Sequence, residues 1–253
     1  MTKPEIAAVK IRQFLSRLVP GDGKRLFSSA IITAAGSGTR MGGAVKALVP
    51  LAGKPCLWYS LDAMERCERI DEVILTIRRE DRPLFESFLK DFPFRKVKAL
   101  AEGGATRQES VKNGFQAVSA KSDLVWIHDG ARPVLTGADL EKLFQAVTRY
   151  GAATAANSMV DTVKRVGKNG RITETVPRDD LFTVQTPQVF RTDLYRVSLA
   201  LAEKDGFTGT DDCSLAEHAG FSVYPCETNR GNLKLTTQDQ VLLLEGILKE
   251  MDR

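Results

Sequence analysis

The residues best placed to do chemistry lie between positions 30 and 46, which read A-I-I-T-A-A-G-S-G-T-R-M-G-G-A-V-K. The apolar start predicts a buried strand, and the small residues after it let the backbone press closely against a ligand. Successive backbone N–H groups of such a loop donate to anionic oxygens, while Arg40 and Lys46 supply positive charge. The pattern therefore predicts a polyphosphate site.

Two familiar glycine loops do not fit this segment. A Walker A loop places Ser or Thr after its lysine, whereas Ala47 follows Lys46, so no hydroxyl is placed to hold magnesium. The dinucleotide fingerprint fails because Met41 stands at its third glycine position. An ordinary strand-to-loop turn remains the alternative, since Gly serves wherever a positive φ is needed.

Two further loops carry polar groups directly after a predicted strand. One spans residues 102–110, where a double glycine permits close backbone approach and Ser110 offers a hydroxyl. The other reads H-D-G-A-R-P, in which Asp129 can serve a metal or a sugar hydroxyl and Arg132 can meet a phosphate. Ligands of open parallel sheets bind beyond the carboxyl ends of the strands, so the three loops predict one site.

The elements that must position these loops alternate between strand and helix. Short apolar runs predict strands at 73–77, 97–100, 124–127 and 182–190, with final strands at 221–224 and 233–235. Helical spacing marks 57–68, 82–92, 107–119, 138–150 and 194–204, followed by a capped helix after 208–212 and a closing helix capped by Thr237. This order predicts an α/β fold with a doubly wound, mostly parallel, Rossmann-like sheet and right-handed crossovers.

One segment departs from the alternation. Residues 160–166 and 171–176 flank Gly167-Lys168-Asn169-Gly170, and Asn-Gly is a strong hairpin signal. Neither strand is apolar enough to join the main core. We therefore expect a protruding β-hairpin arm at about 160–178, which reaches a second subunit because an isolated ribbon is marginal by itself.

Composition narrows the class of protein. The 253 residues carry a net charge of +4 without any basic block, which argues against nucleic acid and suits a small anionic substrate. The four cysteines form no C-x-x-C pair, so reduced thiols and a cytoplasmic location are expected. No apolar run approaches the ~20 residues of a membrane span. Residues 1–28 form a separate amphipathic extension that we expect to be helical, and residues 29–253 form one domain.

An ordered set of short segments completes the pattern. They read A-A-G-S-G-T-R-M with Lys46, G-G-A-T-R-Q-E-S-V, H-D-G-A-R-P, V-D-T-V-K-R, V-P-R, Q-T-P-Q, T-D-D and N-L-K-L-T. Together they closely resemble the 2-C-methyl-D-erythritol 4-phosphate cytidylyltransferase family from about Ser29 to Arg253. The resemblance implies a nucleotide-diphospho-sugar transferase-like fold. It also implies that CTP and the methylerythritol phosphate give the CDP-alcohol and pyrophosphate, with Mg²⁺, in non-mevalonate isoprenoid biosynthesis.

The resemblance also implies roles for individual residues. Its catalytic cations are Arg40, Lys46 and Lys234, which would stabilise charge on the α-phosphate. Its CTP-binding positions are Ala34, Ala35, Gly36, Gly38, Gly104, Arg107 and Ser110. Its acceptor-binding positions are Asp129, Arg132 and Thr210, with Thr162 and Arg178 reaching across a homodimer from the arm. Mg²⁺ would be held mostly by triphosphate oxygens, with Asp129 as the protein ligand.

This sequence departs from the family pattern at two positions. Ala105 stands where many members carry Asp, which removes one expected cue for the base, and Gly130 stands where Ala is usual. The closest alternative is a ribitol 5-phosphate cytidylyltransferase, which shares the loops and differs in the polyol pocket. A non-catalytic nucleotide-binding protein of the same fold is the second alternative. His128 and His218 are expected to be a loop hydrogen-bonder and a surface helix residue, without catalytic roles.

Overall fold

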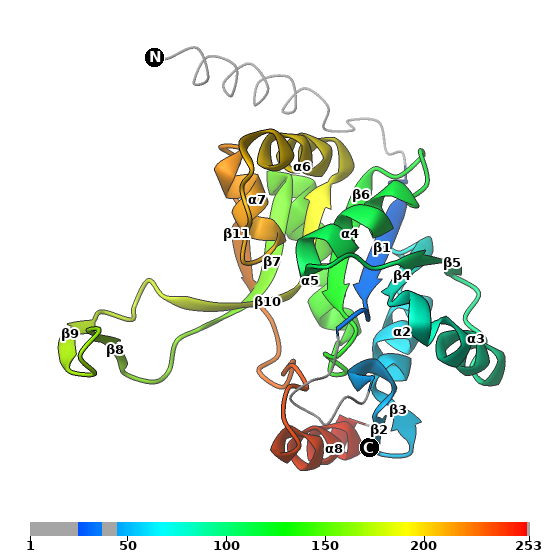
Figure 1. Cartoon of the computed structure of the whole chain (residues 1–253), viewed down its shortest axis with the longest axis horizontal. Helices are drawn as coiled ribbons and strands as arrows, with labels where there is room; N and C mark the ends of the chain where they lie inside the picture. The colour runs from blue at the N-terminus through cyan, green and yellow to red at the C-terminus, as the bar shows by residue number, and fades with distance from the viewer. Residues whose placement is uncertain (1–24, 37–44, 252–253) are drawn as a thin grey trace.

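A seven-stranded sheet forms the centre of the computed structural model, which describes residues 25–36 and 45–251 (Figure 1). Its strands are β1 (Ser28–Thr33), β4 (Glu72–Ile77), β5 (Val97–Glu102), β6 (Leu124–Asp129), β7 (Ala152–Ser158), β10 (Phe182–Arg191) and β11 (Tyr224–Glu227). Their order is β11-β7-β10-β6-β1-β4-β5. Only β10 runs antiparallel to its neighbours in this sheet. The predicted doubly wound, mostly parallel α/β fold is confirmed.

Helices cover both faces of the sheet. These helices are α2 (Cys56–Arg66), α3 (Arg82–Asp91), α4 (Arg107–Gln116), α5 (Gly137–Tyr150), α6 (Thr192–Asp205) and α7 (Asp212–His218). The last helix, α8 (Asp239–Met251), lies away from this sheet, and two short 3₁₀ turns are η2 (Lys46–Leu48) and η3 (Arg79–Asp81). Within the described ranges, no helix is long and apolar enough to cross a bilayer.

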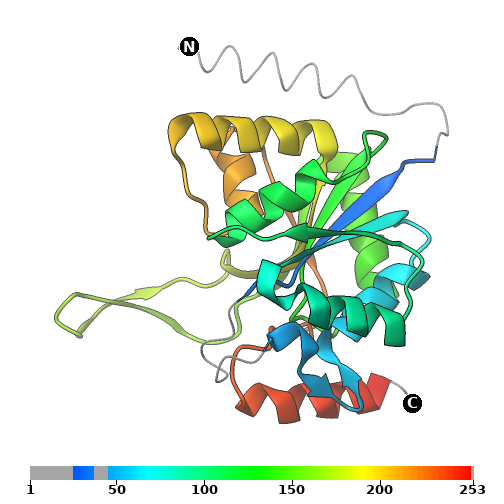
Figure 2. The ribbon, with the colours of Figure 1, turned by 45° about the vertical axis from the view of Figure 1, so that its right-hand side comes forward.

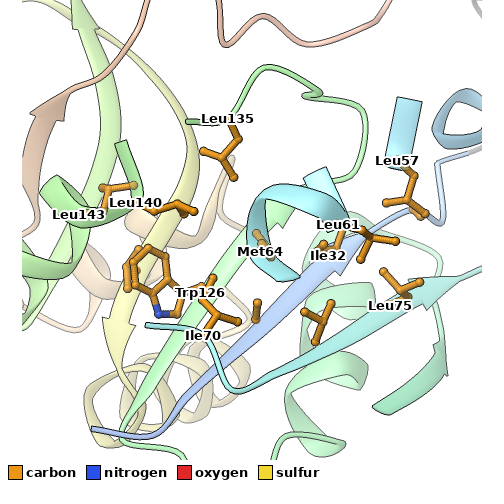
Figure 3. Packing of buried hydrophobic residues seen from close by; sticks show 14 of the residues in the cluster. Ile32, Leu57, Leu61, Met64, Ile70, Leu75, Trp126, Leu135, Leu140 and Leu143 are labelled. Carbon is orange, nitrogen blue, oxygen red and sulfur yellow. The ribbon is translucent and has the colours of Figure 1, made fainter. Parts of the chain in front are cut away.

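The alternation of side chains along β1 divides the core into two layers. Ile32 points into a cluster with residues of α2, α3 and α5, including Leu61 and Met64 (Figure 3). Ile31 points to the opposite face, with Val111 of α4 and Tyr195 of α6. All six side chains are 0 to 1% exposed. Because both faces are buried, β1 reads as a continuous apolar run rather than an alternating one.

A third, smaller cluster holds α8 against a two-stranded ribbon of β2 (Pro50–Leu51) and β3 (Lys54–Pro55). Leu235 belongs to this cluster, is fully buried, and donates its N–H to the carbonyl of Ala131 at 2.8 Å. The predicted strand at 233–235 is therefore wrong: this segment is irregular and is held by one loop rather than by a neighbouring strand. The strand predicted at 221–224 instead begins at Tyr224 and ends at Glu227, because Phe221 packs into the core beside α7.

The hairpin arm extends away from the sheet, as Figures 1 and 2 show. Its strands β8 (Val163–Val166) and β9 (Ile172–Val176) pair only with each other in the described structure. Val166 and Ile172 are 57% and 64% exposed. The arm is confirmed, and its contact with a second subunit stays a prediction.

The start of the domain lies slightly before the predicted boundary. β1 begins at Ser28, and Arg25 already forms an ion pair with Asp71 at 2.8 Å. Residues 25–28 are therefore part of the domain rather than of a helical extension. Residues 1–24, which make up most of the predicted extension, lie outside the described residues.

Candidate active site

The carboxyl ends of β1, β5 and β6 meet at one edge of the sheet, where they border a cavity of about 470 Å³. Its lining residues are Thr33, Ala34, Ala35, Gly36, Lys46, Ala47, Arg78, Gly104, Ala105, Thr106, Arg107, Ser110, Asp129, Ala131, Lys234 and Thr236. The three loops thus border one cavity, as expected, and the role of this cavity as a binding site stays a prediction. The segment before α8 joins them, since Lys234 reaches the same cavity.

The loop before α4 is fixed by a capping box. The hydroxyl of Thr106 accepts the N–H of Glu109 at 3.1 Å, and Glu109 Oε2 accepts the N–H groups of Ala105 and Thr106 at 2.7 and 3.2 Å. Ser110 Oγ accepts the N–H of Gly104 at 3.0 Å and donates to the carbonyl of Thr106 at 2.9 Å. The sequence N-terminal to α4 thus closes a rigid backbone loop along the cavity wall.

Gly103 lets this loop lie against the loop that follows β1. A Cβ at Gly103 would stand 2.5 Å from the Cβ of Ala35 and 3.1 Å from Ser110 Oγ. Any larger residue would therefore separate the two backbone segments that border the cavity. This close approach is the physical reason for the double glycine noted in the sequence.

Asp129 lies at the centre of the charged part of the site. Its Oδ1 accepts from Arg107 Nε at 3.2 Å and from the Thr33 hydroxyl at 3.3 Å, while its Oδ2 accepts from Lys234 Nζ at 2.8 Å and Arg132 Nε at 3.5 Å. Burial by itself would raise the pKa of Asp129, but the charges of Arg107, Lys234 and Arg132 outweigh burial and hold the pKa well below its usual range. Asp129 is therefore ionised at neutral pH.

A buried chain of hydrogen bonds through Thr186 and His128 holds the backbone of Asp129 in place. The Asp129 N–H donates to the Thr186 hydroxyl at 3.0 Å, and that hydroxyl lies 3.1 Å from His128 Nδ1. His128 Nε2 lies 3.2 Å from the carbonyl of Arg132. Burial lowers the pKa of His128 to about 4, with the Asp129 charge acting in the opposite direction, so the ring is neutral at physiological pH. A neutral ring donates from Nε2 and accepts at Nδ1, which satisfies both contacts.

The position of His128 differs from the prediction in one respect. It is a fully buried residue of β6 rather than a loop residue, although its role as a hydrogen-bonder is confirmed. The carbonyl of Asn232 accepts from Arg132 Nη1 at 2.9 Å. This contact connects the segment that carries Lys234 to the hydrogen bonds around His128.

Two acidic side chains near the cavity have different functions. Asp211 is the N-cap of α7 and accepts the N–H of Ser214 at 3.0 Å, which confirms the predicted capping role. Asp212 points inward instead: its Oδ2 lies 2.6 Å from Arg107 Nη1, and its Oδ1 lies 2.6 Å from the hydroxyl of Tyr195. Sequence reasoning missed Asp212 and Tyr195, because nothing local distinguishes the two acids of T-D-D.

Arg78 is a third residue that the sequence interpretation missed. It follows β4 directly, lines the cavity, and forms ion pairs with Asp81 at 2.6 Å and Glu80 at 3.3 Å. The rule that ligands bind beyond strand ends could have found it, since 73–77 was predicted as a strand.

The predicted site residues fall into four groups. Those that line the cavity are Lys46, Lys234, Ala34, Ala35, Gly36, Gly104, Arg107, Ser110 and Asp129. Arg132 contacts Asp129 but does not line the cavity. Thr210 is an exposed residue directly before Asp211, the N-cap of α7. Thr162 and Arg178 lie on the arm, outside the set that lines this cavity, and Arg178 Nη1 donates to the carbonyl of Val160. Arg40 and Gly38 lie outside the described residues.

The donor set around the cavity is poor in metal ligands. The described residues contain no group of three His, Cys, Asp or Glu side chains that could hold an ion. Asp129 is the single acid among the residues that line the cavity in the described part of the chain, and cations already contact both of its oxygens. A divalent ion therefore fits this site only together with anionic ligand oxygens.

Comparison with known proteins relates this geometry to a family. The family model for 2-C-methyl-D-erythritol 4-phosphate cytidylyltransferase matches residues 28–250. A relative of that name from Geobacillus kaustophilus is 42% identical over 221 residues, which are 87% of this chain and 96% of the relative. One from Lysinibacillus sphaericus is 40% identical over 87% of this chain and 95% of its own length.

Solved structures agree with these relatives. The 4-diphosphocytidyl-2C-methyl-D-erythritol synthase of Anaerococcus prevotii superposes with a TM-score of 0.79 at 31% identity, covering 88% of this chain and 96% of its own. The cytidylyltransferase of Thermus thermophilus gives a TM-score of 0.72 at 28% identity, covering 87% and 98%. The protein therefore belongs to the 2-C-methyl-D-erythritol 4-phosphate cytidylyltransferase family.

Proposed function

We propose that this protein transfers the cytidylyl group of CTP to the phosphate of 2-C-methyl-D-erythritol 4-phosphate and releases pyrophosphate. A phosphate oxygen of the acceptor forms a bond with the α-phosphorus of CTP, and the bond from that phosphorus to the bridging β-phosphate oxygen breaks. The attacking phosphate is already ionised, so no general base is required. Catalysis consists of positioning and of stabilising negative charge.

The single observation that carries this proposal is the placement of Lys46 and Lys234 in one cavity with the loop at Gly104 and Ser110. The glycine-rich backbone supports a role in holding the nucleotide, and the lysines support a role in stabilising charge on the α-phosphate. We assign the same role to Arg40 from the family pattern. Asp129, with Arg132 behind it, is proposed to bind the acceptor polyol through a hydroxyl group.

Mg²⁺ is part of the proposal as a companion of the triphosphate. It would neutralise charge on the phosphate oxygens, which would provide most of its ligands, and Asp129 is the carboxylate that lines the cavity among the described residues. Because Asp129 is already paired with Arg107 and Lys234, it could contribute a ligand only by exchanging one of these cations. The steps assigned to the lysines do not depend on this contact.

A pyrophosphate-release screen tests the function. The folded protein is incubated with each of four NTPs and with methylerythritol phosphate, ribitol 5-phosphate and related polyol phosphates. Release from CTP with the branched substrate alone is the expected result. Release with ribitol 5-phosphate but not with the branched substrate would establish the alternative acceptor, and no turnover with any pair would indicate a non-catalytic nucleotide-binding protein.

We further propose a homodimer in which the arm brings Thr162 and Arg178 to the cavity of the other subunit. The exposed, separate ribbon of β8 and β9 supports this assignment. The four cysteines, free in the structure, are compatible with the cytoplasm that we propose as its location.

A mixing experiment tests shared sites. Arg178→Ala and Lys46→Ala are purified separately and then allowed to exchange subunits. If each site combines the lysine of one subunit with the arginine of the other, the mixture regains up to about a quarter of wild-type activity, since one site in half of the dimers is intact. A mixture that is no more active than its components argues against sites completed across a dimer.

A further inference from the structure

Asp212 is the most deeply buried charge next to the proposed active site. Its side chain is 1% exposed, although it belongs to α7 rather than to one of the loops that border the cavity. Two contacts hold its carboxylate, since Tyr195 donates its hydroxyl to Oδ1 at 2.6 Å and Arg107 Nη1 lies 2.6 Å from Oδ2, and its backbone N–H donates to Gln188 Oε1 at 2.9 Å. A buried carboxylate held in this way has one orientation.

The guanidinium of Arg107 is divided between two carboxylates. Nε contacts Asp129 Oδ1 at 3.2 Å, and Nη1 contacts Asp212 Oδ2 at 2.6 Å. Burial by itself would lower the pKa of Arg107, but the two carboxylates outweigh burial and raise it, so the charge is permanent. The shorter contact is to Asp212, which therefore sets the position of the group.

The third guanidinium nitrogen of Arg107, Nη2, could form a second contact with Asp129 if the guanidinium were free to rotate. Nη2 is buried and has no hydrogen-bond partner among the described residues. Nε and Nη2 lie on the same side of a guanidinium, so a small rotation would place both on one carboxylate as a bidentate pair. The carboxylate within reach is Asp129, whose Oδ2 is the oxygen that Lys234 contacts at 2.8 Å.

We propose that Asp212, fixed by Tyr195, is a positioning residue that holds Arg107 in a one-nitrogen contact with Asp129 and thereby reserves Asp129 Oδ2 for Lys234. Without the anchor, Arg107 pairs with both oxygens of Asp129 and displaces Lys234 from its position beside the cavity. The inference rests on the proposed function only where it predicts turnover, since the geometric part concerns the protein without substrates.

The crystal structure of Asp212→Asn without substrates tests the geometry. We expect Arg107 Nε and Nη2 both to lie about 3 Å from Asp129, and Lys234 Nζ to move out of hydrogen-bond distance of Oδ2. Arg107 and Lys234 at their wild-type distances from Asp129 would overturn the proposal. This readout holds even if the protein turns over none of the proposed substrates.

A double-mutant cycle tests the consequence for turnover. Asp212 and Lys234 share no contact among the interactions described above, so a coupling between them must pass through Arg107 and Asp129. We expect Asp212→Asn to lower kcat about tenfold in the wild-type background, because a misplaced charge costs catalysis steeply, and less than about twofold in Lys234→Ala. An equal factor in both backgrounds would indicate a purely structural role.

Two variants complete the design. Asp71→Asn removes the charge of another largely buried aspartate, 12% exposed, which contacts Arg25 and the N–H of Ser28 at the opposite end of β1. Asp71→Asn should lower stability without changing kcat. Coupling between Asp71→Asn and Lys234→Ala would show that the double-mutant cycle measures a loss of stability rather than the position of Lys234.

Tyr195→Phe is the second variant, used if Asp212→Asn fails to fold. It keeps the charge of Asp212 and removes one of the contacts that hold its carboxylate. We expect about a threefold loss of kcat that disappears in Lys234→Ala, and a loss equal in both backgrounds would overturn the proposal.

Discussion

Replacing Asp129 by Asn should destabilise the protein more than replacing a buried aspartate that has only neutral partners. The substitution keeps the size of the side chain and removes a charge that is 8% exposed and that faces Arg107, Arg132 and Lys234. Removing one partner of a buried ion pair costs about 3 to 5 kcal/mol. Lys234 is 40% exposed and can turn to solvent, so we expect the lower end, about 3 kcal/mol.

For a chain of this size, a loss of about 3 kcal/mol lowers Tm by about 6 to 12 °C. Thermal and urea unfolding followed by circular dichroism measure the change. Asp139→Asn is the matched control, since Asp139 is 3% exposed but bonds only to neutral partners, Thr136 and Asn229, and should cost about 1 to 2 kcal/mol. Pyrophosphate should raise the Tm of Asp129→Asn more than that of the wild type, because the uncompensated cations attract anions.

The pH dependence of this loss follows from the direction of the pKa shift. A carboxylate whose pKa is lowered on folding contributes stability that is present above its unfolded pKa and is lost as pH falls below it. The difference between wild type and Asp129→Asn should therefore shrink below about pH 3.9. The reasoning is refuted if Asp129→Asn is no less stable at neutral pH than Asp139→Asn.

Three further predictions concern the same edge of the sheet. Lys46→Ala should lower kcat by about a hundredfold or more in folded protein, since one well-placed donor contributes about 3 kcal/mol, and near-normal turnover contradicts the assignment. Lowering pH from about 6.5 to 4 should destabilise the wild type by up to about 3 kcal/mol, because the unfolded chain protonates His128 while the buried ring stays neutral. His128→Gln should flatten that slope in urea titrations at several pH values, and an unchanged slope assigns the effect to other groups. Gly103→Ala should weaken CTP binding measured by calorimetry, because its Cβ would stand 2.5 Å from that of Ala35, and wild-type affinity would show that the loop yields at little cost.

The sequence by itself predicted most of the fold. β1, β4 and β6 are buried on both faces and read as apolar runs, and α2, α3 and α5 carry a clear apolar stripe, so local pattern and tertiary environment agree there. The rule that ligands bind beyond strand ends then predicts Ser110 and Asp129 on one edge of the sheet. Asn-Gly likewise predicted the arm from four residues.

Local pattern failed where contacts distant in the sequence decide the structure. The segment at 233–235 has the composition of a strand, yet Leu235 is held by the carbonyl of Ala131 and by α8, so it follows the loop surface instead of pairing. β10 pairs antiparallel to both neighbours, an orientation that the apolar pattern of 182–190 does not encode.

The charged network behind the cavity depends entirely on tertiary structure. Arg107 and Asp212 lie 105 residues apart, and Arg107 and Asp129 lie 22 apart, so no spacing rule brings them together. The sequence determined which groups exist and which edge of the sheet carries them. Only the packing of α7 against α6 and α4 decided that Asp212 is buried and must be paired, because a charge shielded from water is stable only beside a partner of opposite sign.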